Sequence, residues 1–480
     1  MTDLKFRLIT TPLYYVNAKP HIGHAYTTIA ADILARYYRL KGEKVFFLTG
    51  TDEHGQKVEE AAKKNGMSPK DHADRMVDNF RGLWKKLNIS EDHKFIRTTD
   101  PGHEKIVKEI LQKLYDDKKI VPRKYSGWYC VPEERFWTDK DLVDGNCPDC
   151  GRPVEHIEEE NYFFLMSEYQ NKLIEHIEKY PDYIQPDTRR NEVLGFLNNN
   201  KLEDLCISRP KSRLSWGIEI PFDKDYVTYV WFDALINYYS ATTYLSPDNN
   251  IPWWPAKLHL IGKDILTTHS VYWSTMLMAL GYDLPETIFA HGWWMMEDEK
   301  MSKSLGNVVD PLELVNEFGA DAFRFYLFRK SVFGKDASFS YEGFGKTYET
   351  ELANELGNLL SRVLSMIQKY DCNFIETPNE IIKVSFETLL DDRGIIEEGY
   401  NSLNFYGILN AIWDRIRQAN AYIESEKPWA LAKENMNRLQ EVLSVLFYGL
   451  KIISGAIYPF MPATSKKNER TAGVNTFKRS

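Results

Sequence analysis

Two short motifs in the sequence bring together residue types that suit phosphate chemistry. The first is K-M-S-K-S at positions 300–304, which follows an apolar run that ends at Trp294. A lysine ammonium is a compact charge for phosphate oxygens, and serine hydroxyls and loop N–H groups add neutral donors. We therefore interpret Lys300, Ser302 and Lys303 as part of a polyphosphate-binding loop. Taken alone, the same residues are also typical of an ordinary solvated loop.

The second motif is H-I-G-H at positions 21–24, which opens a run with helical periodicity. The run predicts a helix from Gly23 to Leu40, so His21 and His24 stand at a helix N-terminus. Nucleotide-binding α/β folds bind anions there, because free N–H groups and the helix dipole both favour phosphate. A single histidine at such a place is more often a cap or a packing residue. With 11 histidines and 27 glycines in 480 residues, a chance H-x-G-H is expected in about one such sequence in seventy.

Together the two motifs are the signature of class I aminoacyl-tRNA synthetases, and the surrounding sequence resembles the methionyl-tRNA synthetase family. The resemblance runs from about Arg7 to about Thr464. It is carried by T-T-P-L-Y-Y-V-N at 10–17, L-T-G-T-D-E-H-G at 48–55, V-W-F-D-A-L at 230–235 and G-K-D-I at 262–265. The resemblance implies that the chain activates L-methionine with ATP and Mg²⁺ to methionyl-adenylate. It then implies transfer of methionine to the 3′ end of tRNA(Met).

The resemblance also implies roles for the residues at matching positions. Catalysis and ATP binding are expected of His21, Gly23, His24, Lys300, Ser302 and Lys303. These groups position ATP and stabilise the charge that spreads over the phosphates, because the reaction needs no acid or base. Asp52, which lies with His54 in the loop after the strand Lys44–Leu48, is expected to pair with the α-ammonium of methionine.

The methionine side chain is expected to enter a pocket that the resemblance places among aromatic and apolar residues. These residues are Leu13, Tyr15, Trp231, Ala234, Tyr238, Ile265, His269 and Trp273. Aromatic walls suit a thioether, which is polarizable and makes favourable contacts with ring edges. Without the resemblance, each of these aromatic residues would be interpreted as part of the core.

Two other functions are compatible with parts of the pattern. A synthetase for valine, isoleucine or leucine would carry a much longer editing insertion between the two motifs, and a cysteine enzyme would need zinc in the substrate pocket. A non-catalytic tRNA-binding protein derived from a synthetase is the alternative outside the enzymes. The intact motifs and Asp52 argue against it.

The order of elements predicts an α/β protein. We expect a Rossmann-type parallel-sheet catalytic domain with an inserted connective, zinc-knuckle-like domain, followed by an all-α helix-bundle domain that binds the anticodon. The strands expected in the main sheet are Lys5–Thr11, Lys44–Leu48, Val227–Phe232 and Leu258–Ile261. The expected domains are 1–115 and 210–310 for the two halves of the Rossmann domain, 116–209 for the insertion, 311–347 for a linking segment, 348–464 for the bundle and 465–480 for a divergent tail.

The C-terminal part of the sequence is predicted to be helical. A helix begins at Asp310-Pro311 and runs toward Phe325, residues 338–345 form an irregular link, and residues 465–480 form a frayed or altered tail. The amphipathic segments of the bundle are Thr350–Gln368, Gly394–Ser425 and Asn437–Ile457. The resemblance makes Asn358, Arg362 and Trp429 the readers of the CAU anticodon. A solvated polar face and a half-buried tryptophan are the ordinary alternative.

Three of the five cysteines are clustered in the insertion. Cys147 and Cys150 form a C-x₂-C pair followed by glycine, which aims two thiolates at one tetrahedral Zn²⁺ ion, and Cys130 is a third candidate ligand. The family pattern would have a fourth cysteine three residues after Cys130, but Glu133 stands there. Three cysteines with a carboxylate can bind zinc, and some relatives hold this fold without metal. Both outcomes stay open from the sequence.

The bulk composition is that of a soluble globular protein. No run of 18 apolar residues indicates a membrane span, and the N-terminus lacks the apolar stretch of a signal peptide. We therefore expect a cytoplasmic enzyme that does not bind membranes. The net charge of −9 means that tRNA must bind through local basic patches. No additional C-terminal dimerisation domain is recognised, so a monomer is expected.

Overall fold

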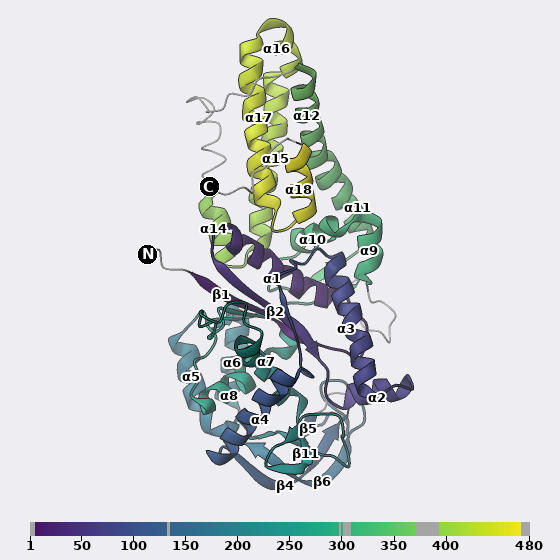
Figure 1. Cartoon of the computed structure of the whole chain (residues 1–480), viewed down its shortest axis with the longest axis vertical. Helices are drawn as coiled ribbons and strands as arrows, with labels where there is room; N and C mark the ends of the chain where they lie inside the picture. Colours follow the sequence, from purple (N-terminus) through teal and green to yellow (C-terminus); the bar gives the residue numbers. More distant parts are fainter. Residues whose placement is uncertain (1–4, 132–134, 297–298, 301–308, 371–392, 472–480) are drawn as a thin grey trace. The chain divides into compact units, whose positions relative to one another are not determined.

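The structure of the protein is a computed structural model that describes residues 5–131, 135–296, 299–300, 309–370 and 393–471 (Figure 1). The chain forms two compact units, each built from segments that are distant in the sequence. The first unit comprises residues 1–20, 41–82 and 91–290, and the second comprises residues 21–40, 83–90 and 291–480.

The first unit is organised around a six-stranded sheet in the order β3-β2-β1-β12-β13-β7. β1 (Phe6–Tyr15) pairs in parallel with β2 (Lys44–Asp52) on one side and with β12 (Leu258–Gly262) on the other. The remaining strands are β3 (Lys94–Arg97), β7 (Ile184–Gln185) and β13 (Ile288–His291). The central strands are almost continuously buried, as parallel strands covered on both faces are. The predicted Rossmann-type sheet is therefore confirmed.

The pairing of β1 with β2 fixes which residues stand side by side at the carboxyl ends of the strands. After an irregularity in the ladder, Leu13 lies opposite Gly50 and Tyr15 lies opposite Asp52. Gly50 is required at its position, because a Cβ atom there would lie 2.0 Å from the backbone oxygen of Ile96 in β3. No other residue fits between β2 and its neighbour unless the backbone moves.

The helices of the first unit connect and cover these strands. α4 and α7 contact each other, and their side chains Leu111 and Phe232 join Phe46 and Leu48 of β2 in one apolar core. The helical segments are α2 (Gln56–Lys64), α3 (Pro69–Lys86), α4 (Pro101–Asp116), the 3₁₀-helix η1 (Met166–Tyr169), α5 (Gln170–Lys179), α6 (Asp187–Asn199), α7 (Val230–Tyr244), the 3₁₀-helix η2 (Lys263–Ile265), the π-helix η3 (Thr268–Trp273) and α8 (Ser274–Leu280).

Two smaller sheets lie within the first unit. The four-stranded sheet β5-β4-β6-β8 is antiparallel and carries the cysteines of the predicted insertion. Its strands are β4 (Ile120–Cys130), β5 (Arg135–Trp137), β6 (Glu155–Phe164) and β8 (Leu205–Cys206). The three-stranded sheet β10-β11-β9 is formed by β9 (Ser208–Pro210), β10 (Glu219–Ile220) and β11 (Asp223–Thr228).

The prediction of a main-sheet strand over Val227–Phe232 is wrong. β11 ends at Thr228 in the small antiparallel sheet, and α7 begins at Val230. The residues Val230 to Phe232 have high strand propensity, but tertiary contacts override such preferences. The decisive contact is made by Asp233 in the first turn of α7, which is buried against two histidine side chains.

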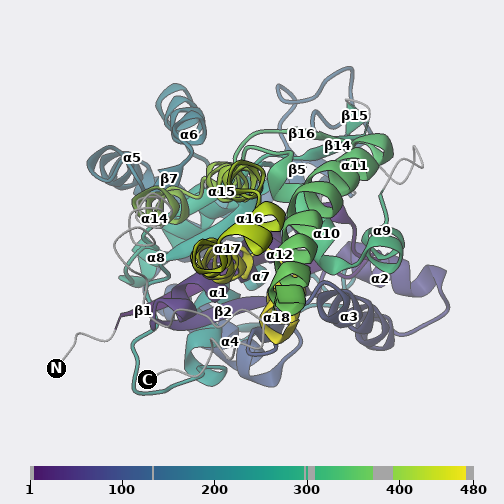
Figure 2. The same ribbon diagram turned by 90° about the horizontal axis from the view of Figure 1, so that it is seen from above.

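The second unit contains α1 (Ile22–Leu40), a small sheet and a helix bundle. The sheet is formed by β14 (Trp294–Met296), β15 (Glu299–Lys300) and β16 (Ala337–Phe339). The bundle consists of α12 (Asn358–Tyr370), α14 (Arg393–Asn401), α15 (Phe405–Glu426), α16 (Pro428–Glu434), α17 (Met436–Ile457) and α18 (Pro462–Thr471). Figure 2 views α15 and α17 nearly end-on, with α16 beside them.

α17 is the one helix among the described residues that is long and apolar enough to cross a membrane. Its apolar side chains, such as Leu443, Leu446 and Ile453, are buried, and the helix contacts α12, α15, α16 and α18. Burial in the centre of a bundle accounts for this composition, because a core helix is apolar on most of its surface.

A buried arginine joins four segments of the second unit. Arg324 donates hydrogen bonds to the backbone oxygens of Leu87 (3.2 Å), Pro459 (2.7 Å) and Phe460 (2.8 Å). Its guanidinium also lies 2.8 Å from the carboxylate of Asp32 in α1. Although burial acts to raise it, the charge of Arg324 holds the pKa of Asp32 at about 2. α1 is thereby tied by a charged contact to the helix that carries Arg324.

Several boundaries in the second unit differ from the prediction. The helix predicted to run from Asp310-Pro311 toward Phe325 is divided into α9 (Pro311–Phe318) and α10 (Ala320–Arg329), because Gly319 has φ 86°. The predicted irregular link at 338–345 instead contains β16 and α11 (Tyr341–Thr347), and the π-helix η4 (Tyr348–Gly357) follows. The long segment Gly394–Ser425 is broken between α14 and α15.

The start of the predicted frayed tail is ordered. α18 continues through Ser465, whose backbone oxygen accepts a hydrogen bond from the Ser454 hydroxyl of α17 at 3.1 Å. Ser465 and Asn468 are buried despite the polar composition of this segment. The prediction is therefore wrong for residues 465–471, and residues 472–480 lie outside the described part of the chain.

Candidate active site

The aromatic residues predicted to bind the methionine side chain lie together in the first unit. The ring of Tyr15 in β1 meets that of Trp231 in α7 edge to face, with centroids 6.1 Å apart. Trp231 and His269 follow at 6.4 Å, His269 and Tyr238 at 5.7 Å, and Tyr238 and Trp273 at 6.0 Å. One strand, α7 and the π-helix η3 thus bring five rings into a continuous wall.

The wall carries no charge at neutral pH. The hydroxyl of Tyr238 lies 2.8 Å from Nε2 of His269, and Nδ1 of His269 lies 2.8 Å from the backbone oxygen of Ile265. Because a carbonyl oxygen only accepts, Nδ1 carries the proton, and Nε2 accepts from Tyr238. Burial lowers the pKa of His269 to about 4. A neutral wall with paired polar atoms suits an apolar, polarizable side chain.

A second buried histidine, His259, contacts two residues of the wall, Trp273 and Tyr238. Nδ1 of His259 lies 2.7 Å from the hydroxyl of Thr10, and its Nε2 accepts the indole N–H of Trp273 at 3.3 Å. The ring of His259 also lies 4.2 Å from that of Tyr238. Burial lowers the pKa of His259 well below its ordinary value, so this ring is neutral as well. The orientation of Trp273 is therefore fixed by a hydrogen bond.

The smaller residues of the predicted pocket belong to the same elements. Leu13 lies in β1 two residues before Tyr15, and Ala234 follows the Trp231 segment in α7, where it is buried. Leu13, Trp231 and Ile265 are partly buried and pack against the main core of the unit. All eight predicted side-chain contacts are thus in one compact unit.

Asp52 ends β2, and its side chain is buried, with 2% exposure. The loop after it is held by Trp216, whose indole N–H donates to the backbone oxygen of Glu53 at 2.5 Å and whose own backbone oxygen accepts from Gly55 at 3.1 Å. The carboxylate of Glu53 receives two hydrogen bonds from Arg97, at 2.7 and 2.8 Å. These hydrogen bonds hold the main chain of residues 53–55, which follow Asp52.

The two motif histidines in the second unit cap the N-terminus of α1. The backbone N–H of His21 donates to Nδ1 of His24 at 3.1 Å, and the N–H of Gly23 donates to Nδ1 of His21 at 3.1 Å. The two rings stack with centroids 3.8 Å apart. Since both Nδ1 atoms accept, each ring carries its proton on Nε2. A Cβ atom at Gly23 would lie 3.0 Å from the His21 ring.

The K-M-S-K-S motif is largely outside the described residues. Lys300 is the last residue of β15, whereas Ser302 and Lys303 lie in the segment that the structure does not describe. The predicted phosphate loop therefore begins at the end of a strand of the small sheet in the second unit.

The three cysteines of the predicted knuckle are brought together. Their sulfur atoms lie within 4.8 Å of one another, and the sulfurs of Cys130 and Cys150 are 3.5 Å apart. Sulfurs that share a tetrahedral Zn²⁺ ion lie about 3.8 Å apart. Cys130 and Cys147 are buried, and Cys150 is half-buried. The donor set therefore fits zinc, and Glu133 lies outside the described residues.

The predicted anticodon residues lie in the bundle of the second unit. Asn358 begins α12 and is exposed, and Arg362 one turn later forms an ion pair of 2.7 Å with Glu424 of α15. Trp429 in the first turn of α16 keeps 45% of its surface exposed. An exposed tryptophan on a bundle is available for stacking, whereas a core tryptophan is not.

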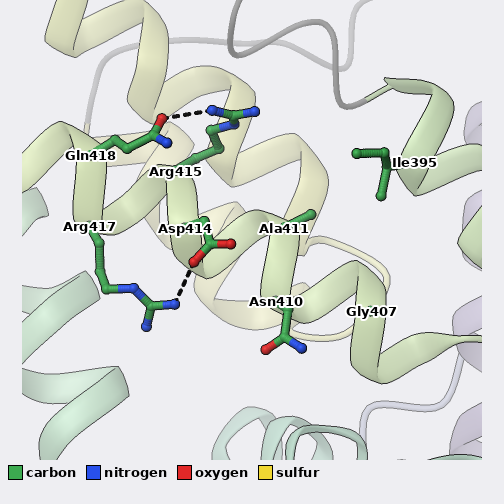
Figure 3. A pocket seen from close by; sticks show the side chains of 8 residues that line it. All are labelled: Ile395, Gly407, Asn410, Ala411, Asp414, Arg415, Arg417 and Gln418. Carbon is green, nitrogen blue, oxygen red and sulfur yellow. Dashed lines mark hydrogen bonds and ion pairs between the residues drawn. The ribbon is translucent and has the colours of Figure 1, made fainter.

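The bundle also carries a surface groove of about 490 Å³. Figure 3 shows its lining of polar side chains along α15, which include Asn410, Asp414, Arg415, Arg417 and Gln418. Arg417 donates to Asp414 at 2.7 Å, and Arg415 donates to Gln418 at 2.7 Å. None of the predicted site residues lines this groove, so its size does not identify the active site.

Comparison with known proteins decides the family. The profile described as "tRNA synthetases class I (M)" matches residues 7–156 and 151–364. Methionine–tRNA ligase of Clostridium perfringens is 50% identical over 470 residues, which cover 96% of this chain and 72% of the relative. The corresponding protein of Thermotoga maritima is 45% identical, with coverage of 96% and 74%. The chain belongs to the methionyl-tRNA synthetase family.

Comparison with a solved structure supports the same family assignment. Mycobacterium tuberculosis methionyl-tRNA synthetase in complex with methionyl-adenylate superposes with a TM-score of 0.93 at 40% identity, and the match covers 99% of this chain and 96% of that one. The chain is thus a catalytic member of its family, a ligase that activates methionine with ATP and joins it to tRNA. The alternatives of a branched-chain or cysteine synthetase, or of a non-catalytic tRNA-binding protein, are not favoured.

Some buried polar residues beside the pocket were not predicted to have a role. Asp233, His103 and His259 are fully buried in the first unit and hydrogen-bonded to residues of other elements. They are widely separated in the sequence, so no local spacing singles them out. Of the three, only Asp233 could have been noticed from the sequence, because it lies inside the block at 230–235 that carries the family resemblance.

The neutral state of His269 predicts a pH-dependent contribution to stability. The unfolded chain takes up a proton at this residue below about pH 6.5, whereas the folded protein does so only near pH 4. Stability should therefore fall as the pH falls through this window. Between pH 7.5 and 5, urea unfolding should show wild type losing about 2 kcal/mol relative to His269→Gln. A constant difference between the two proteins would contradict a neutral His269.

Proposed function

We propose that the enzyme binds methionine in the aromatic pocket of the first unit, with the thioether against the rings and the α-ammonium on Asp52. The observation that carries the proposal is the pairing of Tyr15 opposite Asp52, which puts a buried carboxylate beside the neutral wall. Methionine has one apolar end and one charged end, and this arrangement matches both. An ammonium that is desolvated here needs a counter-charge, which Asp52 supplies.

We also propose that His21, His24, Lys300 and Lys303 stabilise the phosphates of ATP, with Gly23 and Ser302 as further ATP contacts and Mg²⁺ accompanying ATP. The observation in support is the position of the two histidines, whose rings stack at the N-terminus of α1, where free N–H groups and the helix dipole favour phosphate. The methionine carboxylate attacks the α-phosphate, and pyrophosphate leaves. Fixed donors aimed at the developing charge lower such a barrier without any proton transfer.

The bundle of the second unit is proposed to read the CAU anticodon of tRNA(Met). A single-stranded loop can splay out its bases, stack one of them on an aromatic ring and expose base edges to hydrogen bonds. Trp429 offers an exposed ring, and Asn358 and Arg362 are one helical turn apart on α12. Arg362 would exchange its ion pair with Glu424 for a base, which costs little at an exposed site.

Zinc is proposed to bind Cys130, Cys147 and Cys150, with Glu133 or water as the fourth ligand. When bound, the ion would supply a structural cross-link between β4 and the C-x₂-C turn rather than chemistry. The enzyme is further proposed to act as a monomer in the cytoplasm. The domain limits 1–115, 116–209, 210–310 and 311–347, together with a bundle that begins at residue 348, remain our proposal for its functional divisions.

Loss of the Asp52 charge should weaken binding of every ligand that carries the ammonium. For Asp52→Ala and the isosteric Asp52→Asn, the Kd of methionine and of methioninol should rise by about 10²-fold, because an unpaired buried ammonium costs roughly 3 kcal/mol. Calorimetric titration measures both. Binding of 4-(methylthio)butanoate, which lacks the amine, should not weaken. Unchanged affinity for methioninol would show that Asp52 does not meet the ammonium.

A methyl group at Gly23 should disturb ATP without disturbing methionine. Gly23→Ala places Cβ against the His21 ring, so ATP–pyrophosphate exchange should slow by about 10²-fold, as when one charge-stabilising donor is lost. The Kd of methionine should stay unchanged. Gly455→Ala in α17 is the matched control, since its Cβ would meet no atom within 4 Å. Normal exchange by Gly23→Ala would refute the role of the stacked histidines.

Trp429 should matter for tRNA and not for adenylate formation. Trp429→Ala should raise the KM for tRNA by at least about tenfold, since stacking contributes roughly 1–3 kcal/mol per base, while exchange stays intact. Trp429→Phe, which keeps a ring, should recover most of the loss. If aminoacylation and exchange decline together, the side chain holds the bundle rather than tRNA.

The metal content tests the knuckle directly. Protein purified without a polyhistidine tag should contain about one zinc per chain by elemental analysis, and Cys147→Ser should contain much less, because a thiolate ligand is removed. Thermal unfolding of the zinc-depleted protein should begin at a lower temperature. Fully active protein that contains no metal would show that the three cysteines no longer bind zinc.

A further inference from the structure

A buried carboxylate in α7 joins two histidines from other elements of the first unit. Asp233 is fully buried, and its Oδ2 accepts from Nδ1 of His54 at 2.6 Å. Its Oδ1 accepts from Nε2 of His103 in α4 at 2.7 Å. Nδ1 of His103 lies 2.8 Å from the hydroxyl of Ser240, about two turns further along α7. Both carboxylate oxygens are thus occupied by short, well-defined contacts.

The electrostatics of this cluster favour a charged pair. Burial acts to raise the pKa of Asp233, but the charge of His54 brings it below the ordinary value. The pKa of His54 is raised, because Asp233 outweighs the effect of burial. A buried ion pair contributes little net stability compared with apolar residues of the same size. Its value lies in orientation, since short charged hydrogen bonds hold side chains in one geometry.

The two ends of this pair belong to the two halves of the proposed methionine site. His54 lies two residues after Asp52, in the loop that follows the carboxylate proposed to receive the ammonium. Asp233 lies between Trp231 and Ala234, on the helix that forms the aromatic wall. The main chain of the loop is held by Trp216, and the hydrogen bond from His54 to Asp233 joins the loop to α7.

The cluster does not fit a role in the chemistry itself. Adenylate formation needs no general acid or base, because the attacking carboxylate of methionine is already ionised. Both nitrogens of His103 and Nδ1 of His54 are engaged with protein groups, so these atoms do not face a substrate.

We propose that His54, Asp233 and His103 are positioning residues that set the separation between the Asp52 carboxylate and the aromatic wall on α7. With this separation fixed, the ammonium and the thioether of one methionine molecule are engaged together. A shorter or longer amino acid that reaches one end then misses the other, and an error of about 1 Å is enough to lose most of such a gain. The inference rests on the proposed function, in which Asp52 receives the ammonium.

A double-mutant cycle between His54 and Asp52 tests the inference. His54→Leu removes the donor to Asp233, and we expect the Kd of methionine to rise at least about tenfold while the KM for ATP stays within about twofold. His54→Asn keeps an N–H donor near the Nδ1 position and should recover most of the affinity. In an Asp52→Ala background, His54→Leu should change the Kd by less than about twofold, because the group it positions is gone.

Two further variants separate positioning from general destabilisation. Asp233→Asn keeps the shape of the side chain but places an amide N–H₂ against a histidine donor, so it should lose affinity for methionine as His54→Leu does. Gln170→Ala is the matched control, because Gln170 makes three hydrogen bonds, to Leu197, Asn200 and Leu202, and none of these residues lines the pocket. It should lower the unfolding temperature without changing the Kd of methionine.

The outcomes of these experiments distinguish failure of the inference from failure of the proposed role of Asp52. Additive losses in the double mutant, or a Kd for His54→Leu equal to that of wild type, would overturn the inference and leave the proposed role of Asp52 intact. A normal Kd for Asp52→Ala alone would overturn the proposed function, and the inference with it. A rise in the KM for ATP equal to the rise in the Kd of methionine would show a general structural defect and also overturn the inference.

Discussion

The register between β1 and β2 is the constraint on which the site in the first unit depends. It places Tyr15 opposite Asp52, and so brings the first ring of the aromatic wall beside the buried carboxylate. A shift of one strand by one residue would place these two side chains on opposite faces of the sheet. Gly50 protects this register, because only a residue without Cβ lets β2 approach the Ile96 backbone in β3. Gly50, two residues before Asp52, thus constrains the strand that carries the proposed ammonium-binding carboxylate.

The two parts of the proposed site differ in charge: the aromatic wall is neutral, whereas the residues around Asp52 form ion pairs. The wall is made of rings whose polar atoms are satisfied by one another, and burial keeps His259 and His269 uncharged. The loop that follows Asp52 contains paired charges, among them Glu53 with Arg97 and His54 with Asp233. A methionine molecule spans the same contrast, since its side chain is apolar and its ammonium is charged. The proposed pocket is therefore divided in the same way as the ligand proposed for it.

Much of the fold could be predicted from local patterns in the sequence. The apolar runs that became β1, β2 and β12 and the periodic segments that became α1 and α17 carry their own signals. The error at Val227–Phe232 arose because α7 begins among residues of high strand propensity. What fixes that helix start is Asp233, whose partners His54 and His103 are far away in the sequence. The burial of Ser465 in α18 could not be predicted from the local sequence either, because it depends on a contact with α17.

Residue roles were predictable to the extent that short motifs and a family resemblance carry them. The nine predicted methionine contacts include residues from β1, β2, α7, η2 and η3, and no periodicity connects these elements. The histidine tautomers at α1 and the neutral state of His269 required coordinates, because they follow from which atoms face a backbone donor or acceptor. Spacing in a sequence does not contain that information.

The central claim is that the neutral aromatic wall and the buried Asp52 together make this enzyme specific for activation of methionine. ATP–pyrophosphate exchange with single amino acids tests it most directly. The account predicts exchange with methionine, weaker exchange with norleucine by about 2–12-fold because the sulfur–ring contacts are lost, and still weaker exchange with leucine, isoleucine and valine. Equal exchange with norleucine and methionine would contradict the role of the wall, and the absence of exchange with methionine would contradict the account as a whole.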